Sequence, residues 1–224
     1  MDKEVKTLFL KPDEVEINSA MALRFLRVRR EVDEQVKGIF RQCVDEFLEN
    51  VNYKACYRYF DIKIEDDIIF FDDVMQFQSK KLAKNLSGCK GAFLFVATTS
   101  AMVDRLINKH MNLQLSRAMM IDAIGSSAVE CFCDSLCRHI EDENNIKLRP
   151  RFSPGYGDLS IKYQSVVLGV CDCSRKIGVM LTHNNMMVPR KSVSAIVGVR
   201  PENEKCEKSS SCENCDSVNC PYRE

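Results

Sequence analysis

Apolar side chains recur every three or four residues through much of the segment from residue 13 to residue 50, which predicts amphipathic helices. Pro12 and Asp13 mark a helix start, and a second amphipathic stretch begins at Asp33. Four arginines lie beside the first stretch: Arg24, Arg27, Arg29 and Arg30. Acidic residues follow these arginines at once, so a solvated helix face explains them better than a phosphate-binding patch.

Alternation of apolar and polar residues from Tyr57 to Ile64 predicts a strand, and the apolar run at 67–71 predicts a second strand paired with it. The loop between them falls at Glu65 and Asp66. Residues 79–86 predict a short helix that ends at Gly88, because glycine accepts the left-handed conformation common at helix ends. Residues 91–99 then predict a buried strand, and residues 100–109 a helix.

The segment from Leu115 to Asn144 carries the strongest helical pattern. One apolar stripe combines Met119, Ala123, Ser126, Val129, Cys133, Leu136 and Ile140. Glu130 shares its face of this helix with small side chains, namely Ala123, Ser126, Ser127, Cys133 and Cys137. Small neighbours leave room for a ligand to approach the carboxylate. An ordinary, partly exposed glutamate is the alternative interpretation.

Residues 149–158 predict a loop with binding chemistry. Pro154 and Gly155 suit the centre of a type II turn, in which glycine supplies the positive φ. Glycines on both sides of Tyr156 allow the backbone to come close to a ligand while the ring projects. Arg151 offers a planar, permanently charged fork for a carboxylate. A structural turn with a packed tyrosine is the alternative.

The last part of the body mixes both kinds of element. We expect Asp158 to cap the segment that follows it, and residues 159–176 fit either a strand or a helix. A helix end is predicted at 176–178. Residues 179–182 and 192–199 predict strands joined by a loop through Met186, Met187 and Pro189. Helices combined with strands in this order indicate an α+β class rather than a parallel doubly wound sheet.

Composition adds limits on function. The chain has 224 residues and a formal net charge of zero, which argues against a dedicated nucleic-acid-binding protein. No apolar run approaches the roughly 18 residues of a membrane span. The first residues do not form a signal peptide, so we expect a cytoplasmic protein whose thiols are free or bound to metal. We predict one domain over residues 1–200 and a Cys-rich tail over residues 201–224.

The 12 cysteines fall into two groups. Eight lie among apolar neighbours and are predicted to be core residues: Cys43, Cys56, Cys89, Cys131, Cys133, Cys137, Cys171 and Cys173. The others lie in the tail with the spacing C-x5-C-x2-C-x4-C: Cys206, Cys212, Cys215 and Cys220. Four thiolates suit zinc or an iron–sulfur cluster, although the spacing matches no standard ferredoxin run. Thiols without a metal are the remaining alternative.

Three segments together resemble a known family. The run 151–156, Arg-Phe-Ser-Pro-Gly-Tyr, resembles the Arg-x-x-Pro-Gly-Tyr loop of the activation domain of cobalamin-dependent methionine synthase. Residues 128–132, Ala-Val-Glu-Cys-Phe, lie where that family has a helix with a ligand-binding glutamate. Residues 177–182, followed by Pro189 and 192–194, resemble its strand–loop–strand segment. The resemblance covers residues 115–199 well and the N-terminal part loosely.

The resemblance implies a twisted antiparallel sheet with flanking helices and a site for S-adenosylmethionine. In that family the domain presents the methyl group of this ligand to a cobalamin, so that cob(II)alamin is reductively methylated during methionine biosynthesis. Carried over to this chain, Glu130 accepts hydrogen bonds from the ligand's ammonium group and Arg151 grips its carboxylate. Backbone groups of the loop Ser153-Pro154-Gly155 contact ligand edges, and the Tyr156 ring lies over the sulfonium or the corrin.

The chain departs from the family pattern in three ways. Arg200 and Pro201 lead into the Cys-rich tail where the family has a tyrosine pair, and one acidic ligand contact has no matching position. The sequence also shows no cobalamin-binding module. We therefore expect a stand-alone activation domain of a split methionine synthase, not catalytic alone. Its partners would be a cobalamin-binding subunit and an electron donor such as flavodoxin or ferredoxin. A small iron–sulfur or zinc redox protein acting through the tail, and a module that binds no small ligand, are the alternatives.

Overall fold

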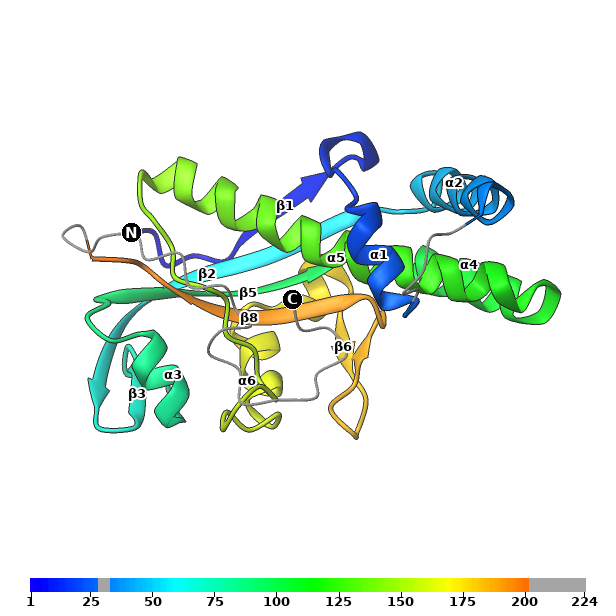
Figure 1. The fold of residues 1–224 in the computed structure, drawn as a ribbon. Helices are drawn as coiled ribbons and strands as arrows, with labels where there is room; N and C mark the ends of the chain where they lie inside the picture. The colour runs from blue at the N-terminus through cyan, green and yellow to red at the C-terminus, as the bar shows by residue number, and fades with distance from the viewer. Residues whose placement is uncertain (28–32, 202–224) are drawn as a thin grey trace.

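A computed structural model describes residues 1–27 and 33–201 of the chain. Its centre is an antiparallel sheet in the order β4-β3-β2-β5-β8, with β1 paired to another part of the long β2 (Figure 1). The strands are β1 (Lys6–Leu10), β2 (Tyr53–Glu65), β3 (Ile68–Phe71), β4 (Met75–Gln78), β5 (Gly91–Thr98) and β8 (Ser192–Gly198). A separate hairpin pairs β6 (Met180–Leu181) with β7 (Met187–Val188).

Helices cover both faces of this sheet. On one face lie α1 (Ser19–Phe25), α2 (Glu34–Leu48), α4 (Ala101–Leu113) and the long α5 (Leu115–Asn144), and the opposite face carries α3 (Lys80–Asn85), α6 (Tyr163–Val170) and α7 (Cys173–Ile177) (Figure 1). Side chains of β5 alternate between the two cores: Phe93 and Phe95 pack on the α5 side, whereas Leu94 and Val96 pack on the α6 side. All eight residues of β5 are therefore buried.

The α+β class with a curled antiparallel sheet and flanking helices is confirmed. Helix α5 has the bounds that its periodicity predicts, and α2 and α3 begin directly after their side-chain caps, Asp33 and Ser79. Residues 159–176, which fit either element, form the short helices α6 and α7. Strands β1, β4 and β7 were not expected, since β7 lies in the predicted loop, and the strand predicted at 179–182 is limited to Met180–Leu181.

The predicted core cysteines are largely confirmed. Six of the eight are buried, while Cys131 and Cys137 on α5 are half-buried. No helix in the described ranges is both long and apolar enough to cross a membrane. Because residues 202–224 lie outside the described residues, the proposed boundary near residue 200 stays a prediction.

Candidate functional site

The segment that carries Arg151 lies beside the edge strand β8. Phe152 and Ile196 exchange two backbone hydrogen bonds, of 2.9 and 2.8 Å, and a further bridge joins Leu148 to Val199. The Phe152 side chain enters the core on the α6 side. Since neighbouring side chains in extended backbone point to opposite faces, Arg151 points to the α5 side.

Arg151 there binds two carboxylates of α5. Its Nη2 lies 2.9 Å from Glu130 Oε2, and its Nη1 contacts Asp134 Oδ1. The two acids are four residues apart and so share one helix face. The Arg151 side chain is 24% exposed, against 37% for Glu130 and 58% for Asp134. The guanidinium is thus the least exposed of the three groups, and both carboxylates are partly exposed to solvent.

The charge of this site is negative. Burial raises the pKa of Cys133 well above its usual value and that of Cys137 to about 11, so both nearby thiols are neutral at physiological pH. One guanidinium and two carboxylates then give a net charge of −1. Such a site favours a ligand that carries positive charge next to Glu130 and Asp134.

The loop after Arg151 is a tight turn. Gly155 has a φ of +89°, and its N–H donates to the Leu159 carbonyl at 2.9 Å, while the Tyr156 N–H donates to the Ser153 carbonyl at 3.0 Å. A Cβ on Gly155 would meet Ile161 Cδ1 at 3.0 Å. The Gly155 N–H and the Ser153 carbonyl, which were expected to contact a ligand, therefore already have hydrogen-bond partners within the turn. A ligand would have to compete for them or use other loop groups.

Tyr156 projects from this turn. The residue is 51% exposed, and its ring packs edge-on against the buried Phe152 ring with centroids 5.4 Å apart. Pro154, between Arg151 and Gly155, is buried. The turn therefore presents an aromatic face to solvent while its base is fixed in the core.

Asp158 fastens the loop to the start of α3. Its carboxylate accepts hydrogen bonds from the Ser79 hydroxyl and, at 2.8 Å, from the Lys80 N–H. The Ser79 hydroxyl, together with backbone N–H groups of α3, holds the pKa of Asp158 below its usual value. The expectation that Asp158 caps the segment after it was wrong: it caps a helix about 80 residues earlier, because the loop folds back onto α3.

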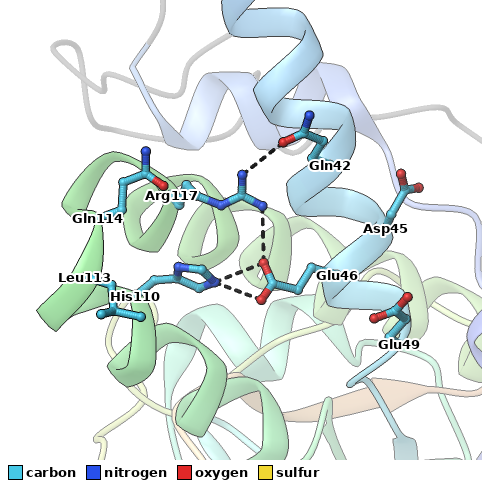
Figure 2. Close-up of a pocket in the computed structure, with 8 residues that line it drawn as sticks. All are labelled: Gln42, Asp45, Glu46, Glu49, His110, Leu113, Gln114 and Arg117. Carbon is cyan, nitrogen blue, oxygen red and sulfur yellow. Dashed lines mark hydrogen bonds and ion pairs between the residues drawn. The ribbon is translucent and has the colours of Figure 1, made fainter.

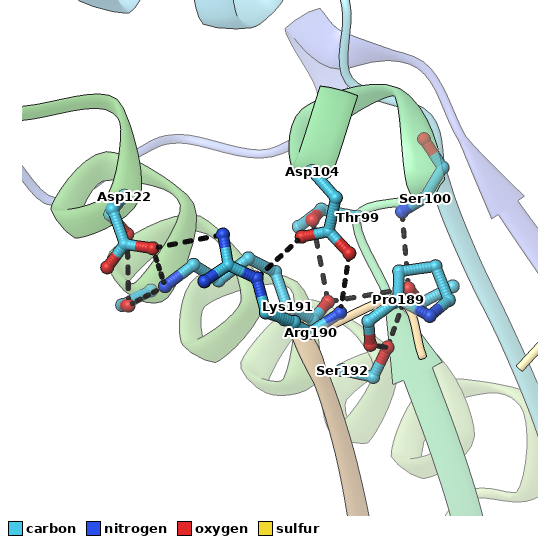
Figure 3. A network of polar contacts seen from close by, with 10 residues as sticks. Thr99, Ser100, Asp104, Asp122, Pro189, Arg190, Lys191 and Ser192 are labelled. Carbon is cyan, nitrogen blue, oxygen red and sulfur yellow. Dashed lines mark hydrogen bonds and ion pairs between the residues drawn. The ribbon is translucent and has the colours of Figure 1, made fainter. Parts of the chain in front are cut away.

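A second basic residue lies on the same face of α5. Lys191, at the entry to β8, places Nζ 2.8 Å from Ser126 Oγ and 3.0 Å from Asp122 Oδ1, and it is only 12% exposed (Figure 3). Gly125 allows this approach, since a Cβ there would meet Lys191 Cγ at 3.2 Å. Nearby, Arg190 pairs with Asp104 of α4 (Figure 3).

These contacts show what the sequence interpretation missed. Polar side chains follow α5 at intervals of four residues: Asp122, Ser126, Glu130 and Asp134. Asp134 was not among the expected site residues, although its spacing from Glu130 was visible in the sequence. Lys191 and Asp122 were missed as well, and no local sequence signal marks their pairing.

A surface cavity of about 760 Å³ lies elsewhere, between α2 and the junction of α4 with α5 (Figure 2). At its floor the Glu46 carboxylate lies 2.9 Å from His110 Nε2 and 3.3 Å from Arg117 Nη2. Lys109 Nζ lies 3.4 Å from the same carboxylate. None of the predicted ligand-binding residues lines this cavity.

The expected metal ligands, Cys206, Cys212, Cys215 and Cys220, lie outside the described residues, so the zinc or iron–sulfur site stays a prediction. Within residues 1–27 and 33–201, no group of His, Cys, Asp or Glu side chains is arranged to hold a metal ion.

Comparison with known proteins shows a similarity of structure. No family model matches the chain, and no curated protein matches it. Among solved structures, the chain is similar to the MetH reactivation domain bound to AdoHcy, with a TM-score of 0.71 and 14% identity. The match covers 91% of this chain and 81% of that domain. At this identity the likeness shows the fold: the curled sheet with its flanking helices is that of the MetH reactivation domain.

Proposed function

We propose that this protein binds S-adenosylmethionine at Arg151, Glu130 and the turn 153–156, and presents its methyl group to a cobalamin on a partner protein. The observation that carries the proposal is the cluster of Arg151 with Glu130 and Asp134, which joins the predicted loop to the predicted helix face. The fold supports it, since the similar solved structure is a reactivation domain bound to AdoHcy.

The charges of ligand and site are complementary. S-adenosylmethionine carries a carboxylate, an ammonium group and a sulfonium, so its net charge of +1 faces a site of net charge −1. Glu130 is the half-exposed acceptor for the ammonium group. Asp134 is the more exposed of the two carboxylates on Arg151. A ligand carboxylate would therefore displace Asp134 and take over its contact with Nη1.

Tyr156 supplies the second part of the site. The residue is half exposed, and its ring packs against the buried Phe152 ring, which fixes the position of the tyrosine on the turn. An aromatic face attracts a sulfonium electrostatically, and it would equally pack on a flat corrin. We place the ligand's methyl group at this outer side of the turn, where a partner protein has access.

No side chain of this chain needs to act as a nucleophile or a general base. The methyl transfer chemistry belongs to the sulfonium and to the cobalt of the partner's cobalamin, and the protein supplies orientation and electrostatics. The full proposal includes a cobalamin-bearing methionine synthase subunit and an electron donor such as flavodoxin or ferredoxin in the cytoplasm. It rests on the resemblance of residues 115–199 and on the fold.

Isothermal titration of the purified chain with S-adenosylmethionine tests the ligand. We expect saturable binding with one site per chain, in the absence or the presence of a cobalamin-bearing partner. No heat of binding under either condition would refute the proposed ligand. A reductive methylation assay then tests the role: the partner's cob(II)alamin should be converted to methylcobalamin only when this chain, ligand and reductant are all present.

A further inference from the structure

Three cysteine thiols meet on the face of the sheet opposite α5. Cys56 lies on β2, Cys171 follows the last turn of α6, and Cys173 is the first residue of α7. All three are 0 or 1% exposed. The Sγ atoms of Cys56 and Cys173 lie 3.3 Å apart, and the Cys171 thiol, which donates to the Leu94 carbonyl at 3.5 Å, interacts with both. The fold thus brings together thiols that are 117 residues apart in the sequence.

The local structure explains the meeting. Cys56 pairs with Val96 of β5, and both side chains point into the core on the α6 side. Between Cys171 and Cys173 the chain turns at Asp172, which has a left-handed φ of +49°. That turn separates α6 from α7 and buries the cysteines on both of its sides against the sheet.

The environment of Cys56 differs from that of the other core cysteines. Hydrogen bonds from Cys171 and Cys173 to its sulfur lower the pKa of Cys56, and the positive charge of Lys176 acts in the same direction. Burial instead raises the pKa of Cys43 and of Cys133. Because the thiolate is the reactive form, this environment favours Cys56 as the thiol of the trio that is oxidised first.

We propose that Cys56 and Cys173 form a reversible redox pair, which hydrogen peroxide oxidises to a disulfide that joins α7 to β2. The Cys56 thiolate attacks one peroxide oxygen, the O–O bond breaks, and a sulfenic acid and hydroxide result; the hydroxide takes up the proton that the Cys56 thiol released and becomes water. The Cys173 sulfur then attacks the Cys56 sulfur, forms the S–S bond and releases a second water. In total, two thiols and one peroxide give one disulfide and two waters.

The geometry favours a disulfide over a metal site. The two sulfurs need to approach only from 3.3 Å to the roughly 2.05 Å of a disulfide bond. Among the described residues, these thiols included, no group of His, Cys, Asp or Glu side chains is arranged to hold a metal ion. Because the three thiols are buried, peroxide has to reach them through a local opening of the structure, such as that of the five-residue α7.

Peptide mapping of the full-length protein tests the pair directly. The reduced chain is treated with hydrogen peroxide, remaining thiols are alkylated, and the protein is digested with trypsin. We expect a cross-linked product of peptides 55–58 and 163–175, in which Cys171 is alkylated and Cys173 is not. Dithiothreitol should return both peptides to their thiol form. Oxidation should also raise the melting temperature by about 5 °C, since the cross-link closes a long loop.

Matched variants identify the reactive residues. Cys56→Ala should abolish the cross-link, whereas Cys43→Ala, at an equally buried site outside the trio, should leave its yield unchanged. The proposal is overturned if Cys56 and Cys173 are both recovered fully alkylated from the wild-type protein after oxidation. It is also overturned if Cys171 is the linked residue, or if the protein carries tightly bound zinc or iron that Cys56→Ala removes. The wild-type map decides even if a variant does not fold.

Discussion

Two arginine-centred clusters lie on α5, and they differ in the balance of charge. Near the start of the helix, Arg117 shares the single carboxylate of Glu46 with His110 and Lys109. Further along, Arg151 alone faces two carboxylates, Glu130 and Asp134. Donors are in excess in the first cluster and acceptors in the second.

This difference separates the Glu46 cluster, which we interpret as structural, from the proposed binding site at Arg151. The acceptor atoms of Glu46 are all used by protein groups, and its side chain is 21% exposed, so the cluster ties α2 to α4 and α5. Glu130 and Asp134 keep acceptor capacity on half-exposed oxygens. The Glu46 cluster lines the surface cavity described above, yet the charge balance favours the Arg151 cluster as the proposed site for a cationic ligand.

The strongest test of this contrast replaces the arginine of each cluster by alanine, one at a time. Arg151→Ala should weaken S-adenosylmethionine binding about 100-fold, because a charged hydrogen-bond partner of the ligand is lost and two carboxylates are left unpaired. Arg117→Ala, the matched control, should leave the dissociation constant within about twofold while lowering stability. Calorimetric titration measures both. Equal losses of affinity in the two variants would remove the distinction.

Glu130→Gln should weaken binding about tenfold, because the amide accepts a hydrogen bond from the ligand's ammonium group without charge. Asp142→Asn serves as the control, since it removes an exposed carboxylate from the same helix. Titration under identical salt conditions gives the comparison. If both substitutions weaken binding alike, Glu130 acts only through the overall charge.

Acid should act on the Glu46 cluster. Burial opposes ionisation of Glu46, but hydrogen bonds from His110 and Arg117 outweigh it and hold its pKa below the usual value. A lowered folded-state pKa stabilises the fold above the unfolded-state pKa of about 4.3, and this contribution is lost as pH falls through the folded-state value. Glu46→Gln should therefore cost on the order of 1 kcal/mol at pH 7, and this cost should shrink steadily as pH falls below the unfolded-state pKa of about 4.3.

Urea denaturation of the wild type and the variant over this pH range measures that difference. Asp45→Asn, at an exposed position of the same cavity, should show a constant and small effect. A Glu46→Gln deficit that does not shrink with acid would mean that the carboxylate charge does not stabilise the cluster.

The smallest expected effect belongs to Asp134. If the ligand carboxylate displaces Asp134 from Arg151, Asp134→Asn removes a competitor as well as a negative charge, and the two changes oppose each other. Affinity should then stay within about threefold of wild type, against the tenfold loss for Glu130→Gln. A loss for Asp134→Asn that equals or exceeds the Glu130→Gln loss would show that Asp134 itself holds the ligand.

The sequence predicted local features well and long-range pairs poorly. Periodicity gave the bounds of α5 and the face of Glu130, because a helix repeats every few residues. The partner of Asp158 was misjudged, since the loop returns to α3 far back in the chain. The Glu46 cluster joins three separate helices. Strand β1 has only five residues, whose apolar and polar positions alternate too weakly to predict a strand, and its formation depends on its pairing with β2.

Hydrogen–deuterium exchange with and without S-adenosylmethionine tests most directly which cluster binds the ligand. The account predicts that saturating ligand slows exchange in residues 126–137 and 148–160, around Glu130, Arg151 and the turn. Exchange in residues 42–49 and 110–117, around Glu46 and Arg117, should not change. Protection confined to the Glu46 cluster, or no change in either region at saturation, would contradict the central claim.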